Sequence, residues 1–300
     1  MRPVKQMDIK PGMKVKELVE EMSKSGVFGA GRIAKAAEIL KEMKQDKDCK
    51  KFLGLAGAMV PGGMKNIIID MLKNGYIDAL VTTGANLTHD MVEALGFEHY
   101  QGTSQIDDKE LHKKGIDRIY ETFMPNKVYE ELEKFFNQNF NELKNETNIK
   151  EFLWKIGSII KKESILKTCY EKKIPIFCPG IADSGIGLMM WGHLAKGEEV
   201  KLKAFEDLKE IMDIAWTAKK TGVIYVGGGV PKNYIQQAMQ LTKGASYGIQ
   251  ITMDRPEPGG SSGAELREGI SWGKLSEKGK CVDVICDATI ALPMIYAAVK

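Results

Sequence analysis

The chain has 300 residues, of which 43% are hydrophobic and 28% charged, as is usual for a globular protein with a substantial core. Its net charge of +3 is too small to indicate a nucleic-acid-binding protein, which would need a basic patch. The absence of a long apolar span and of a signal peptide predicts a cytoplasmic protein, and five cysteines without C-x-x-C spacing predict reduced thiols and no bound metal.

Residues 1–50 are predicted to form a helical arm, with helices at 16–22 and 29–43, and residues 51–300 are predicted to form one domain. In that domain, short apolar runs alternate with helical segments. Strands are expected at 52–60, 77–83, 174–178, 222–226, 245–252 and 281–286. Helices are expected at 64–74, 87–95 with Thr88 as N-cap, 127–143, 149–173, 184–195, 205–220, 231–242, 261–272 and 288–299, and residues 97–126 are expected to be irregular.

This alternation predicts an α/β fold with a doubly wound, mostly parallel, Rossmann-like sheet. Four expected strand ends lead into turns, at 80–86, 175–187, 223–229 and 282–288, and the first three turns are rich in glycine. Glycine lets a ligand approach the backbone, and the N-terminus of the next helix attracts an anion. The turns therefore predict a ligand-binding edge, although each alone also fits an ordinary connection, and none matches G-x-G-x-x-G or the P-loop pattern.

Lys274, in the run Ser271–Lys274, is a candidate covalent catalyst. A lysine forms an imine only when its amine is neutral, and burial or nearby cations favour that form. Trp272 could supply an apolar wall, and Arg267, Lys278 and Lys280 could supply positive charge. The alternative is a surface lysine whose stem packs on the indole.

Together these segments resemble the deoxyhypusine synthase family from about Phe52 to the C-terminus. The matching motifs are Ser271–Lys274, Thr82–Gly84, Pro179–Asp183, Gly227–Gly229 and Asp287–Ala288, in the family's order and spacing. The resemblance implies an α/β homotetramer with active sites between subunits. It also implies an NAD-dependent enzyme that moves the aminobutyl group of spermidine, through an imine on Lys274, to a lysine of the hypusine-containing translation factor.

The resemblance also implies roles for individual residues. The NAD contacts would fall on Gly57, Ala58, Pro61, Thr83, Gly84, Ala85, Asp183, Met253, Asp254, Asp287 and Ala288. The substrate contacts would fall on His89, Asn233, Gly259, Gly260, Ser261, Glu268 and Trp272. Without the resemblance, Glu268 would be read as a solvated helix residue and His89 equally well as a capping or packing residue. His99 and His112 lie in polar surroundings and are assigned no role.

Several positions depart from the eukaryotic family pattern. Thr88 and His89 replace paired acids, Asn233 replaces a histidine and Leu188 replaces an acid, while Ala58 and Pro61 replace hydrogen-bonding residues. The chain instead resembles archaeal and bacterial members, including deoxyhypusine synthase-like proteins. The alternative function is therefore aminobutyl transfer to a free diamine such as putrescine, giving homospermidine. A third hypothesis is a non-catalytic NAD- or polyamine-binding subunit, against which Lys274 argues.

The C-terminal helix suggests association. The segment 292–299 is apolar on most faces, and such a helix is buried either in its own core or against a partner. Together with the family resemblance, this predicts a homo-oligomer, most simply a tetramer.

Overall fold

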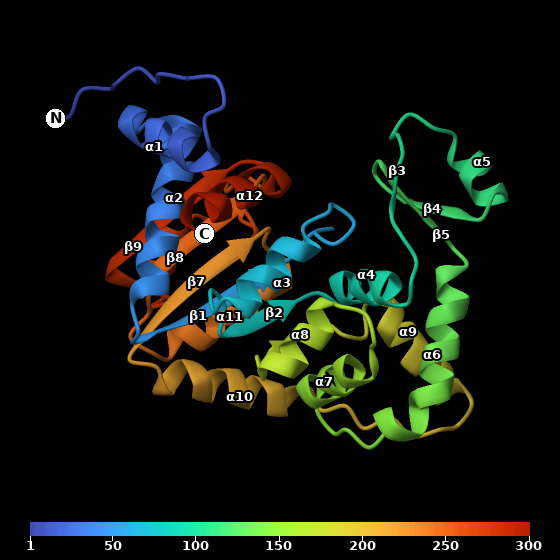
Figure 1. Ribbon diagram of the computed structural model, residues 1–300. Coiled ribbons are helices and arrows are strands. Elements are labelled where there is room, and N and C mark those ends of the chain that lie inside the picture. Colours follow the sequence, from blue (N-terminus) through green and yellow to red (C-terminus); the bar gives the residue numbers. More distant parts are fainter. The chain divides into compact units, whose positions relative to one another are not determined.

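The computed structural model describes residues 1–300 and has an α/β architecture (Figure 1). The strands are β1 (Cys49–Leu55), β2 (Ala79–Thr82), β3 (Tyr100–Gln101), β4 (Ile116–Ile119), β5 (Thr122–Pro125), β6 (Ile176–Phe177), β7 (Lys220–Val226), β8 (Ala245–Thr252) and β9 (Leu275–Ile285). The helices are α1 (Val15–Ser25), α2 (Phe28–Gln45), α3 (Lys65–Lys73), α4 (Gly84–Ala94), α5 (Asp108–Lys113), α6 (Val128–Leu143), α7 (Ile149–Ile159), α8 (Ile165–Lys172), α9 (Gly185–Ala195), α10 (Ala204–Thr217), α11 (Gly229–Gln240) and α12 (Ala288–Val299), with a 3₁₀ helix at Leu266–Ile270.

The main sheet has the strand order β6-β2-β1-β7-β8-β9, and a small antiparallel sheet has the order β3-β5-β4. The pairs β1–β7, β7–β8 and β8–β9 are parallel. The central strand β7 is buried from Thr221 to Val226, as expected for a strand covered on both faces. The predicted α/β class with a mostly parallel, Rossmann-like sheet is confirmed.

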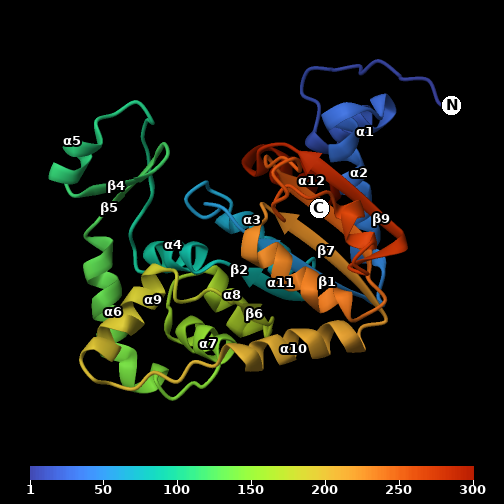
Figure 2. The same cartoon turned by 180° about the vertical axis from the view of Figure 1, so that it is seen from behind.

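The chain divides into two compact units. The first contains residues 1–57, 74–81 and 209–300, and the second contains residues 58–73 and 82–208. In the first unit, α2 contacts β8 and β9 on one face of the sheet (Figure 1), and α11 contacts β1 and β7 on the other (Figure 2). No helix is both long enough and apolar enough to cross a bilayer. The predicted domain boundary at residue 50 stays a prediction.

The C-terminal helix α12 packs within its own unit. It contacts α1 and α2, and its Leu292, Ile295 and Tyr296 are buried (Figure 1). Most of the apolar surface of α12 is therefore buried within its own unit. The helix by itself does not indicate a partner subunit. The exposed Ile290 is the exception.

Four sequence-based expectations were wrong in detail. Helix α4 begins at Gly84 with Thr83 as its cap, so Thr88 is not the N-cap; its hydroxyl donates to the Gly84 carbonyl at 2.9 Å. The expected helix 149–173 is two helices, because the chain turns at 160–164 and restarts at the Ser164 cap. The expected helix 261–272 is only the 3₁₀ turn, and residues 97–126 contain α5 and the small sheet.

In the second unit, Asp90 holds two helices together. Its carboxylate is fully buried on α4 and accepts the backbone N–H groups of Ile165 at 2.9 Å and Leu166 at 3.0 Å, the first residues of α8. Burial raises the pKa of Asp90 to about 6, and the two backbone hydrogen bonds act in the opposite direction. The carboxyl is thus a buried cap supplied by a different helix.

The variant Asp90→Ala should lower the free energy of unfolding by about 2 kcal/mol at neutral pH, because two buried N–H groups lose their acceptor. The loss should be larger near pH 4. A carboxyl whose pKa is raised on folding contributes stability that falls as pH rises through the folded value of about 6. Urea unfolding at several pH values measures both effects, with Asp117→Ala, which changes an exposed acid of β4, as control. An unchanged midpoint at every pH would contradict this assignment.

Candidate functional site

In the second unit, the N-termini of α4 and α9 pack against each other. Each begins at a hydroxyl cap: the Thr83 Oγ1 accepts the Asn86 N–H at 3.3 Å, and the Ser184 Oγ accepts the Gly187 N–H at 3.0 Å. A Cβ added to Gly84 would lie 2.4 Å from the Ser184 Cβ, so the contact requires glycine there. The structure thus brings the predicted cofactor residues Thr83 and Gly84 next to the turn that carries Asp183.

Asn86, in the first turn of α4, indicates a polar binding site at this junction. Its side chain is 1% exposed, and both its amide nitrogen and its amide oxygen lack a hydrogen-bond partner. Leaving a buried amide unpaired is costly, so such a group commonly awaits a ligand or a water. Two helix N-termini also offer partial positive charge to an anion. The residues present therefore fit the diphosphate of a dinucleotide, and Asn86 is a candidate site residue that the sequence did not reveal.

The other predicted cofactor residues of this unit lie in turns. Ala58 is exposed and Pro61 is buried in the turn after β1, while Ala85 and Asp183 are exposed at the two helix starts. Exposed acids at such starts are suited to ribose hydroxyls.

His89 belongs to a hydrogen-bonded group on the same helix α4. Its Nδ1 lies 2.9 Å from the Nε2 of His99, and the Nδ1 of His99 lies 2.9 Å from the Glu93 Oε1. The other Glu93 oxygen pairs with Lys65 from α3. His99, which was assigned no role, is therefore a buried partner of His89. The helical spacing of His89 and Glu93, four residues apart, was the available signal.

In the first unit, a buried lysine anchors the 253–264 loop. Lys232 on α11 is 1% exposed, and its Nζ donates to the carbonyl of Ser261 and, at 2.7 Å, to that of Ala264. The Gly229 N–H donates to the Ser262 Oγ at 2.7 Å. These bonds fix the loop containing Gly259, Gly260 and Ser261 over the start of α11, although the loop itself is exposed.

Charged residues predicted for the site influence the pKa of Lys232. Burial lowers the pKa of Lys232 to about 8. The carboxylates of Asp283, Glu268 and Asp254 oppose this shift, while the ammonium of Lys274 adds to it. Lys274, Glu268 and Asp254 thus all influence the charge of a second lysine that the sequence did not single out.

Lys274 lies at the amino end of β9. Its carbonyl accepts the Ala245 N–H at 3.1 Å, and its Nζ lies 4.8 Å from the centre of the Trp272 ring. Trp272 is 57% exposed, so the predicted apolar wall is open in a single chain. Two of the cations expected beside Lys274 are engaged elsewhere, since Arg267 pairs with Glu265 and Lys280 with Glu42.

The remaining predicted cofactor residues of this unit follow the carboxyl ends of strands. Gly57 follows β1, Met253 and Asp254 follow β8, and Asp287 caps α12 after β9 by accepting the Thr289 N–H at 2.7 Å. Ala288 is the first residue of α12. The backbone of Lys274 therefore starts at the opposite end of the sheet from these turns.

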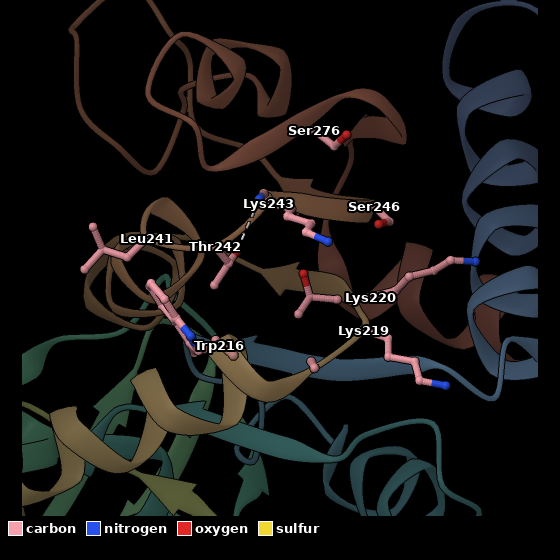
Figure 3. A pocket seen from close by; sticks show the side chains of 12 residues that line it. Trp216, Lys219, Lys220, Leu241, Thr242, Lys243, Ser246 and Ser276 are labelled. Atoms are coloured by element: carbon pink, nitrogen blue, oxygen red, sulfur yellow. Dashed lines mark hydrogen bonds between the residues drawn. The ribbon is translucent and has the colours of Figure 1, made fainter.

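Two cavities flank the first unit. One of about 460 Å³ is lined by residues that include Gly229, Asn233 and Ser261, which places two predicted substrate residues in one hollow. Another of about 540 Å³ lies at the amino ends of β7, β8 and β9 and is lined by Trp216, Lys243 and Ser246 (Figure 3). It contains no predicted site residue.

Comparison with known proteins settles the family. The family model described as "Deoxyhypusine synthase" matches residues 17–299. The chain belongs to the deoxyhypusine synthase family. It is 48% identical to "Probable deoxyhypusine synthase 1" of Methanosarcina mazei, over 99% of this chain and 94% of that one. The matched range, residues 17–299, spans Lys274 and all the motifs named above.

Solved structures share the fold at low identity. A crystal structure from Entamoeba histolytica, described as a deoxyhypusine synthase, has a TM-score of 0.68 at 15% identity, covering 98% of this chain and 96% of that one. The ternary complex of AgrE with ornithine and NAD⁺ has a TM-score of 0.55 at 12% identity, covering 88% of this chain and 33% of that one. The deoxyhypusine synthase fold is thus found in a larger, distant protein as well.

The variant Lys232→Met should loosen the 253–264 loop of this deoxyhypusine synthase family member. The thioether fills the space of the lysine stem but donates no hydrogen bond to Ser261 or Ala264. We expect faster proteolysis within the loop and an amine KM raised about tenfold. The free energy of unfolding should change by no more than about 2 kcal/mol, because removing a buried charge offsets the lost bonds.

Limited proteolysis and an amine titration measure the effects of Lys232→Met. Lys243→Met, which changes an exposed lysine of the cavity at the amino ends of β7, β8 and β9, is the matched control. Equal protection of the loop in both variants would contradict the anchoring role of Lys232.

Proposed function

We propose that the chain is an NAD-dependent aminobutyl transferase of the cytoplasm that performs deoxyhypusine synthesis. It takes the aminobutyl group of spermidine and passes it to a lysine of the hypusine-containing translation factor. The observation that carries the proposal is the position of the Lys274 Nζ, 4.8 Å from the centre of the Trp272 ring, in a chain of the deoxyhypusine synthase family.

The lysine chemistry follows from the residues present. Lys274 attacks the oxidised carbon of the substrate, forms a carbon–nitrogen double bond and releases diaminopropane. The acceptor lysine repeats the exchange and frees Lys274. Glu268, exposed on the 3₁₀ turn, is suited to hold a substrate ammonium, and Trp272 covers the Lys274 ammonium on one side.

NAD supplies the hydride acceptor for the first step and the hydride donor for the last. We propose that the second unit binds it through Thr83, Gly84, Ala85 and Asp183, together with Ala58 and Pro61. In the first unit we propose Gly57, Met253, Asp254, Asp287 and Ala288. The unpaired Asn86 amide supports the proposal, as does the NAD⁺ complex of the structurally similar AgrE.

We also propose a homotetramer. Helix α9 exposes Leu188, Trp191 and Leu194, which lie three residues apart and are 57%, 63% and 50% exposed. Such an apolar stripe is typical of a surface that a partner covers. Sedimentation tests this proposal, and a fully active monomer would overturn it.

One assay separates the candidate functions. Purified protein is incubated with NAD and spermidine labelled in the aminobutyl group, and with either the translation factor or putrescine. Label on the factor supports the proposal. Label on putrescine alone would favour the homospermidine alternative. Binding of both ligands without transfer to either acceptor would indicate a non-catalytic subunit.

A further inference from the structure

The larger cavity of the first unit lies at the amino ends of β7, β8 and β9, beside the last turns of α10 and α11 (Figure 3). Its volume of about 540 Å³ is that of a site for a small organic ligand. Three of its lining residues are lysines, and none is acidic. This amino-end cavity is therefore suited to an anion, unlike the proposed amine site, which contains Glu268.

A row of hydroxyl groups begins three neighbouring strands at the cavity wall. Thr221 on β7 and Ser246 on β8 directly precede the paired residues Gly222 and Tyr247, so their side chains share one face of the sheet. Ser276 is the second residue of the adjoining strand β9. None of the three hydroxyls makes a hydrogen bond within the chain, although Thr221 is only 4% exposed. A buried hydroxyl without a partner at the wall of a cavity is a donor available to a ligand.

Lys243 supplies the charge. The other two lysines of the lining are already paired, Lys219 with Asp48 at 3.0 Å and Lys220 with Asp46 at 2.8 Å. Lys243 makes no ion pair, and its exposed side chain lies among the other lining side chains (Figure 3). Its ammonium is therefore the one unpaired charge of the lining, with three N–H donors for an anion.

The helix ends beside the cavity are largely capped. The last carbonyls of a helix carry partial negative charge, which would oppose an anion. The Thr217 hydroxyl donates to the Asp213 carbonyl of α10 at 2.8 Å, and the Thr242 hydroxyl donates to the Met239 carbonyl of α11 at 2.7 Å. Each last turn thus has a carbonyl satisfied by its own threonine, and the lysine and the free hydroxyls set the polarity of the cavity.

One side of the cavity is flat and apolar. Trp216 and Leu241 lie there, across from Lys243 and Ser246, and are 69% and 58% exposed (Figure 3). An exposed indole beside an aliphatic side chain offers a stacking surface to a planar ring. The cavity therefore combines a ring-stacking wall with a group of anion donors.

We propose that the amino-end cavity binds a phosphate monoester attached to a planar ring, as in a mononucleotide. The Lys243 ammonium and the three free hydroxyls hold the phosphate, and the ring stacks on Trp216. Four donor groups suit a phosphate, which has three strong acceptor oxygens, better than a carboxylate, which has two. No residue proposed for the catalytic or cofactor site lines the cavity, so this site is independent of the proposed function.

Fluorine NMR of 5-fluorotryptophan-labelled full-length protein reports on the cavity directly. The Trp216 resonance is one of four and is assigned from its absence in Trp216→Phe. Adenosine 5′-monophosphate, used as the probe, should shift it with a dissociation constant of about 10⁻⁴ M at low salt. Adenosine, which lacks the phosphate, should need concentrations at least about tenfold higher. No shift of the Trp216 resonance up to about 10 mM probe, or equal affinity for adenosine, would overturn the proposal.

Two variants test the phosphate contacts. Lys243→Met should weaken binding of the probe about tenfold, because the ammonium is lost from an exposed side chain whose change leaves the fold intact. Thr221→Val keeps the side-chain shape and should weaken binding about fivefold by removing one hydroxyl. Lys41→Met, which changes an exposed lysine of α2, is the matched control and should bind the probe as wild type does. Unchanged affinity in Lys243→Met would show that the cavity does not hold the phosphate.

Discussion

Lys274→Arg should abolish aminobutyl transfer, by at least about 10³-fold, while NAD affinity stays within about twofold of wild type. Arginine keeps the positive charge and much of the contact with Trp272, but its guanidinium stays protonated and forms no imine. The residues proposed for the cofactor do not include position 274. Labelled spermidine measures the transfer, and titration with NAD measures the binding.

Borohydride trapping identifies the reacting amine in the same experiment. In wild-type protein, label should become fixed to Lys274 alone, and the arginine variant should trap none. Lys278→Arg is the matched control, since Lys278 is an exposed lysine four residues further along the chain. Substantial transfer by Lys274→Arg would rule out the covalent mechanism.

Gly84→Ala should weaken NAD binding by at least about tenfold and lower the free energy of unfolding by about 2 kcal/mol. The added methyl group would lie 2.4 Å from the Ser184 Cβ and 2.6 Å from its Oγ, so the starts of α4 and α9 must move apart. The serine is too short to swing aside, and its hydroxyl caps α9. Separating the helix starts also disturbs the surroundings of the buried Asn86 amide.

NAD titration and urea unfolding measure the effects of Gly84→Ala. Gly192→Ala is the matched control, because a Cβ at Gly192 on α9 meets no atom within 4 Å. That variant should be as stable as wild type or slightly more so, since alanine is the better helix former. Normal NAD affinity in Gly84→Ala would show that the cofactor does not bind at this junction.

The regular elements were predictable where local pattern and tertiary structure agree. Strand β8 occupies the expected residues 245–252, and α12 occupies the expected 288–299 behind its Asp287 cap. The start of α4 was misplaced because Thr83 and Thr88 are both plausible caps from sequence alone. Only the packing of Gly84 against Ser184 distinguishes them. The break between α7 and α8 depends on Asp90, a residue about 75 positions away along the chain.

The candidate site was predictable only in its linear motifs. The Ser271–Lys274 run and the glycine turns can be recognised in the sequence, because each consists of neighbouring residues. Lys232, Asn86 and His99 were not, because their roles depend on burial and on partners from other segments. A lysine at the start of an amphipathic helix gives no sign that it will be 1% exposed under a loop.

The attachment of Lys274 has a consequence for motion. Its N–H is bonded to the Gly269 carbonyl at 2.8 Å, and its own carbonyl is bonded to Ala245 in the sheet. The peptide that bears the reactive amine is thus fastened on both sides, whereas residues 253–261 are exposed throughout. Amide exchange should accordingly be slow at Lys274 and fast across 255–261. During turnover the backbone of Lys274 would stay in place, and opening to admit or release an amine would fall to residues 253–260, which precede the anchored Ser261.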